Sequence, residues 1–277
     1  MLAAPQHARV GDLWFGLSLG AAALTVVASA AGATVPSIYA KETALWAAQG
    51  MGQDVVNLTI AAPALVLTAL LARRGALAAT FVWLGLTLYL AYSYVLYAFF
   101  VHFNALFLVY VGALGLSVYA IGGAAADLAR YDWCASVAAA AGERALGGLM
   151  SVTAVAFGAL WLSEILPALA AGTPPRSAVE AGLIVNPVHV LDLALAVPAM
   201  LAAGILVWRR RTVGFLTALP LAVFMVMMAL AIAGMAIAMA VRDLGPAAAA
   251  APMGVLAVVT ALLAARVLRS LRPPAAV

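Results

Sequence analysis

The chain has 277 residues, of which 67% are hydrophobic and only 9% are charged. Soluble domains have about half apolar and about a quarter charged residues, so lipid must solvate most of this chain. The net charge of +4 comes from basic residues in short clusters between apolar runs, which is a pattern of membrane topology and not of nucleic-acid binding. The single cysteine, Cys134, excludes an intrachain disulfide.

The apolar runs predict an all-α fold: a polytopic integral membrane helix bundle that forms one membrane domain over residues 1–277. Each run is long enough to cross about 30 Å of hydrocarbon at about 1.5 Å per residue. A tight turn around His102 must divide the third span from the fourth, because so long an apolar run cannot be a single span. The eight predicted spans are 13–34, 55–72, 76–100, 103–126, 146–170, 190–208, 213–241 and 249–268.

The positive-inside rule gives an orientation for these spans. Lys41, Arg176 and Arg242 are the basic residues on one side, which leaves eleven of the 14 on the side of the N-terminus. We therefore expect both termini in the cytoplasm. The use of arginine in place of lysine is typical of a GC-rich bacterial genome, so the expected location is a bacterial inner membrane.

The first apolar run has an alternative interpretation. Arg9, the run itself and the segment Ala28-Ser29-Ala30 together resemble a cleavable signal peptide. Cleavage there would leave seven spans in the same orientation.

The segment Asp54–Arg74 resembles the segment His189–Arg209 when the two are aligned from their first residues, with seven of 21 positions identical and Pro63 over Pro198. The same shift pairs span one with five and span three with seven. This indicates a four-plus-four duplication with repeats over 1–135 and 136–277, related by an axis along the membrane normal. The alternative is two unrelated spans of similar composition.

Polar residues gather at the outer, extracytoplasmic face. Asp54 and Asn57 stand three apart at the start of span two, and His189 and Asp192 stand three apart at the start of span six. Residues three apart share a helix face, so the repeat would bring the two pairs together as one ligand-binding site. Capping of the helix starts is the alternative role for the acids. Further candidates for the site are Glu42, His102 and Glu164.

The third span carries Tyr89, Ser93 and Tyr97 at intervals of four, which puts them on one helix face. Tyrosines near a span end commonly form an interfacial belt, but Tyr89 lies deeper and its hydroxyl needs a partner inside the bundle. We expect Tyr89 and Tyr97 to line a polar vestibule that leads in from the outer face.

These features favour transport or binding of a small solute or cation by a non-enzymatic membrane protein. One alternative is a membrane enzyme with an outer-face acid/base pair or a divalent metal held by Asp54, His189 and Asp192. Haem is disfavoured, because His102 would sit in a tight turn. The other alternative is a subunit or assembly factor of a membrane complex. The expected partners are the lipid bilayer, a small solute or cation, and a second copy of the chain or another membrane protein.

Overall fold

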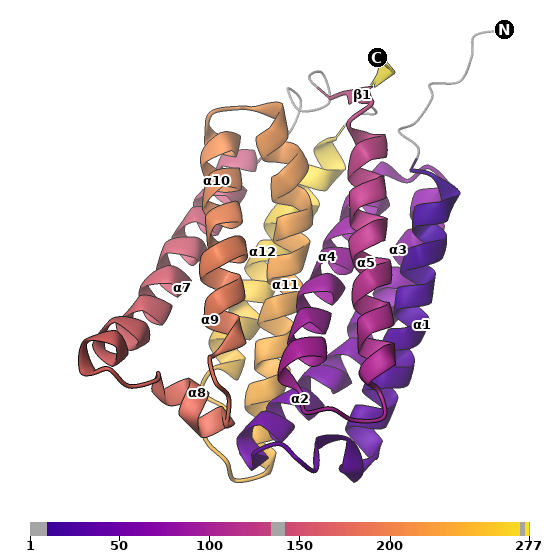
Figure 1. Cartoon of the computed structure of the whole chain (residues 1–277). Coiled ribbons are helices and arrows are strands. Elements are labelled where there is room, and N and C mark those ends of the chain that lie inside the picture. The colour runs from indigo at the N-terminus through magenta and orange to yellow at the C-terminus, as the bar shows by residue number, and fades with distance from the viewer. Residues whose placement is uncertain (1–9, 134–141, 272–274, 277) are drawn as a thin grey trace, which may run out of the picture.

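A computed structural model gives the structure of the chain and describes residues 10–133, 142–271 and 275–276. Eight of its helices are long and apolar enough to cross a membrane, so the chain is a multi-pass α-helical membrane protein. The first span begins and the last span ends at the same end of the bundle (Figure 1). We call this the arginine-rich end, because Arg73, Arg130, Arg209 and Arg269 lie there, and we call the other the opposite end.

The spans are, in order, α1 (Asp12–Thr34); α2 (Ala44–Val56) with the π-helix η2 (Asn57–Ala61) and α3 (Ala62–Arg73); α4 (Leu77–Phe100); α5 (Phe107–Leu128); α7 (Glu143–Ala171); α9 (Pro187–Leu191) with the π-helix η3 (Asp192–Ala196) and α10 (Val197–Trp208); α11 (Thr212–Val241); and α12 (Ala250–Ser270). Four short elements of the described chain lie outside the spans: the 3-10 helix η1 (Pro36–Tyr39), the helix α8 (Arg176–Ala181) and the antiparallel strands β1 (Tyr131–Asp132) and β2 (Ala275–Ala276).

Seven of the eight spans begin and end within a few residues of the predicted limits. The prediction was wrong for the second span, which begins at Ala44 and not at residue 55. Thr43 caps this helix by accepting a hydrogen bond from the Trp46 backbone N–H at 3.2 Å. The extra turns carry polar residues, and they are helical because those residues face a neighbouring helix and not water.

The two halves of the chain form two neighbouring helix groups. Helices α1 to α5 lie on one side and α7 to α12 on the other, with α4 and α11 in contact between them and α2 packed on α11 (Figure 1). Helix α4 is the most buried span, whereas α7 leans away from the bundle towards the opposite end (Figure 1). The second group is therefore less closed than the first.

Several element boundaries recur under the shift that lays Asp54 on His189. The π-helices begin at Asn57 and Asp192, the spans that contain them end at Arg73 and Trp208, and the next spans begin at Leu77 and Thr212. Each π-helix lies just before a proline. A proline ring clashes with the carbonyl four residues earlier, and the wider π-turn gives that carbonyl room.

Glycines allow the two groups to approach closely. A Cβ atom on Gly52 of α2 would stand 2.6 Å from the Gly234 carbonyl oxygen of α11, and one on Gly85 of α4 would stand 2.5 Å from the Pro220 carbonyl oxygen. Small residues at such crossings replace the missing hydrophobic driving force with close van der Waals packing.

We expect Gly52→Ala to lower the thermal stability of the purified protein, because its methyl group meets backbone that cannot move aside. Overpacking of this kind costs about 1–3 kcal/mol. Thermal unfolding in detergent micelles measures the effect. Gly16→Ala is the matched control, since Gly16 has open space around it and alanine favours the helix. Equal stability of the two variants would contradict the close contact.

Candidate functional site

A ladder of polar contacts joins the second span to α4. The Tyr89 hydroxyl donates to Asn57 Oδ1 at 2.7 Å, and Gln53 Nε2 donates to the Ser93 hydroxyl at 2.9 Å. One turn further, Tyr97 contacts the Gly50 carbonyl. The steps are about one helical turn apart on each helix and run in opposite directions. Tyr89 thus has the internal partner that its depth requires.

Asp54 lies inside the first helix group and is fully buried. Its Oδ2 accepts from the Tyr39 hydroxyl at 2.5 Å, and its Oδ1 accepts from the Tyr97 hydroxyl at 2.9 Å. Gly32 of α1 leaves space for the carboxyl, because a Cβ there would overlap Oδ2. Burial, and next the Asp54 charge, raise the pKa of Tyr39 well above its ordinary value, so this hydroxyl stays a donor at neutral pH.

His189 and Asp192 lie in the second helix group and contact α7. His189 is buried, and its Nε2 lies 3.3 Å from Glu164 Oε2, although not in a normal hydrogen-bond geometry. The Trp161 ring packs on the imidazole, with ring centroids 4.9 Å apart. Asp192 accepts from Trp161 Nε1 at 2.9 Å and from the Tyr92 hydroxyl of α4 at 2.8 Å.

Glu42 and His102 form a separate contact at the opposite end. The Glu42 carboxylate accepts from the His102 backbone N–H at 2.7 Å and lies 2.9 Å from its Nδ1. The Glu42 side chain is buried, whereas that of His102 is about half exposed. This contact ties the chain before α2 to the turn between α4 and α5. Glu42 precedes the helix and so does not continue the polar face of Gln53 and Asn57.

The predicted site residues thus fall into separate sets of contacts. Among the described residues, no hydrogen bond or ion pair joins Asp54 or Asn57 to His189 or Asp192, and the single four-residue site stays a prediction. In the described part of the chain, no three His, Cys, Asp or Glu side chains lie together as a group that could hold a metal ion. Asp54, His189 and Asp192 therefore do not form such a group. The capping role fails for Asp54, because its helix begins well before it, at Ala44.

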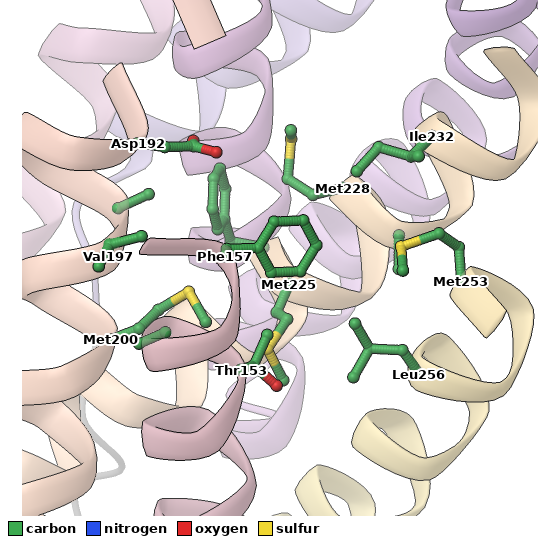
Figure 2. A pocket seen from close by; sticks show the side chains of 14 residues that line it. Thr153, Phe157, Asp192, Val197, Met200, Met225, Met228, Ile232, Met253 and Leu256 are labelled. Atoms are coloured by element: carbon green, nitrogen blue, oxygen red, sulfur yellow. The ribbon is translucent and has the colours of Figure 1, made fainter. Parts of the chain in front are cut away.

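A pocket of about 50 Å³ lies within the second helix group, and Asp192 is at its edge (Figure 2). Asp192 is the one charged residue in its described lining. The remaining lining is largely apolar, with Met and Phe side chains from α7, α10, α11 and α12. It includes Phe157, Met200, Phe224, Met225, Met228 and Met253.

Sequence reasoning missed three residues that hold the acids: Tyr39, Tyr92 and Trp161. Tyr39 and Trp161 are 15 and 31 residues from their acids, and no periodicity relates them. The ladder had a readable signal, since Gln53 and Asn57 stand four apart and Ser93 and Tyr97 likewise. No protein-family model, curated protein or solved structure is significantly similar to the chain, so the site has to be interpreted from its own geometry.

We expect Tyr89→Phe to destabilise the protein by about 1–3 kcal/mol, because it leaves the buried Asn57 side chain without its one hydrogen-bond donor. Chemical unfolding in mixed micelles measures this change. The control is Tyr119→Phe, which removes a hydroxyl from a side chain that is 70% exposed on α5. A loss no larger than that of the control would show that the ladder contributes nothing.

Proposed function

We propose that this protein is a membrane carrier for small, largely apolar organic cations, which bind in the pocket beside Asp192. The observation that carries the proposal is one carboxylate at the edge of an otherwise apolar pocket with no basic residue in its described lining. A carboxylate in an apolar environment is costly unless a positive charge compensates it. A bound organic cation would supply that charge.

The lining favours the same class of solute. The aromatic faces of Phe157 and Phe224 attract cations, and methionine side chains adapt to ligands of different shape. Tyr92 and Trp161 donate to the Asp192 carboxylate and hold its orientation, while its remaining lone pairs can accept from an ammonium group. Anionic solutes would be repelled, and neutral solutes would leave the charge uncompensated.

Movement of the solute is supported by the π-helices within the second and sixth spans. We propose that the chain is a duplication of a four-span unit, because the π-helices at Asn57 and Asp192 and the helix ends near them recur under one constant sequence shift. Irregular helices at corresponding positions of two halves are typical of substrate sites in repeat-built transporters. Small residues at α2–α11 and α4–α11 crossings, such as Gly52 and Gly85, permit the halves to shift against each other.

Asp192→Asn tests the solute site. Loss of a charged hydrogen bond should weaken binding of phenethylammonium about 10- to 100-fold, measured by calorimetric titration of the purified protein. Asn fits, since the corresponding residue of the first half is Asn57. Uptake of the same cation into proteoliposomes should fall in parallel.

The matched control is Asp243→Asn, in an exposed turn where the backbone has a positive φ that Asn tolerates. It should bind as the unchanged protein does. Equal affinity for phenethylammonium and for neutral phenethyl alcohol would overturn the charge recognition, and binding without uptake would indicate a solute-binding protein that does not transport.

We further propose that the arginine-rich end faces the cytoplasm of a bacterial cell, as the distribution of basic residues indicates. Ile184, which is 95% exposed, lies in the connection at the opposite end. An Ile184→Cys, Cys134→Ser double variant should react with a membrane-impermeant maleimide in intact cells. The unchanged protein, whose one thiol follows α5 in the sequence, should react only after lysis. The reverse pattern would invert the orientation.

A further inference from the structure

Asp54 is a buried acid for which the proposed solute pocket provides no role. It is fully buried within the second span, and no Lys, Arg or His in the described part of the chain forms an ion pair with it. Its partners are the hydroxyls of Tyr39 and Tyr97. Ionisable groups at such depth are expensive and require either a positive partner or a proton.

The surroundings of Asp54 can satisfy both forms of its carboxyl group. As a carboxylate, it accepts hydrogen bonds from Tyr39 and Tyr97. As an acid, it needs an acceptor, and the nearby buried hydroxyl of Ser29 can serve as one. Tyr97 also contacts the Gly50 carbonyl at 3.3 Å, which gives its hydroxyl a second acceptor when Asp54 is neutral.

A second pocket extends from the surroundings of Asp54 towards the opposite end of the bundle. It has a volume of about 50 Å³, and its lining includes both tyrosines that hold Asp54, together with Gln49, Gly50 and Gln53. The pocket therefore meets the same hydroxyls that contact the carboxyl group. A hydroxyl can take a proton on its oxygen while it passes its own proton to Asp54, so that the tyrosine is unchanged after the transfer.

We propose that Asp54 is a reversible proton-binding site, reached from the opposite end through the pocket at Tyr39 and Tyr97. The other titratable groups that face the site are the phenols of Tyr89, Tyr94 and Tyr110, and Glu42 lies beyond them. None of these is a base that would permanently neutralise Asp54. A proton is favoured over a metal ion because both carboxyl oxygens already accept from hydroxyl donors. The proposal does not depend on the solute pocket, which lies in the other helix group.

Infrared difference spectroscopy of the full-length protein in liposomes tests the proposal directly. Between about pH 4 and about pH 10, one component of the protonated-carboxyl C=O band should disappear as the pH rises, and that component should be missing from the difference spectrum of Asp54→Asn. Asp192→Asn should keep the band, which separates this test from that of the solute pocket. A pH-independent band, or the same spectrum in Asp54→Asn, would overturn the proposal.

A second variant tests the role of the hydroxyls. Tyr97→Phe removes a donor to the charged form, so the midpoint of the band should move up by about one pH unit. Tyr94→Phe is the matched control, since its buried hydroxyl does not donate to Asp54 and its loss should move the midpoint less. An equal shift in both variants would show that the Tyr97 hydroxyl has no special role in proton binding by Asp54. Loss of the band on addition of sodium ions at constant pH would instead identify a metal-ion site.

Discussion

Lipid offers no hydrogen bonds, so each polar group inside the bilayer has to find its partner within the chain. This constraint explains why Tyr89, Ser93 and Tyr97 recur at every fourth position and why Gln53 and Asn57 are spaced likewise. Two such rows on antiparallel helices meet step by step. The ladder sets how α2 and η2 lie against α4, and through the Gly52 contact the same span is packed on α11.

The two halves meet the constraint with different side chains at corresponding positions. Under the shift that lays Asp54 on His189, the residues Tyr89, Ser93, Tyr94 and Tyr97 of α4 correspond to Phe224, Met228, Ala229 and Ile232 of α11. The first group is consequently filled by hydroxyls around Asp54. The second lacks those hydroxyls, and a Met- and Phe-lined pocket lies there beside an acid.

The difference between the side chains of α4 and α11 also explains why the two polar pairs have different partners. The sequence shift places Asp54 over His189 and Asn57 over Asp192. Asp192 lacks the tyrosine that Asn57 finds on its own half, and it accepts instead from Tyr92 across the centre and from Trp161 of α7. Asp192 is therefore a half-buried acid held by donors from two different helices at the edge of a pocket, whereas Asp54 is enclosed.

The spans could be predicted from the sequence because their length and apolarity are set by the bilayer itself. The start of α2 could not, since its polar residues resemble a loop until the partner row on α4 is known. The acids were recognised as unusual, but their donors were not, because Tyr39 and Trp161 are brought to them only by the fold. The π-helices had a weak signal in Pro63 and Pro198, since a proline ring disturbs the helical turn before it.

Helix α4 contacts both acids and so provides a physical connection between them. Tyr97 donates to Asp54, and Tyr92, which precedes it on a different face of the same helix, donates to Asp192. Both tyrosines are carried by this one helix, which is the most buried of the spans. At Gly85, α4 lies against the Pro220 carbonyl and the Val223 side chain of α11. The contacts to Asp54 and Asp192 therefore lie on two different faces of the same helix.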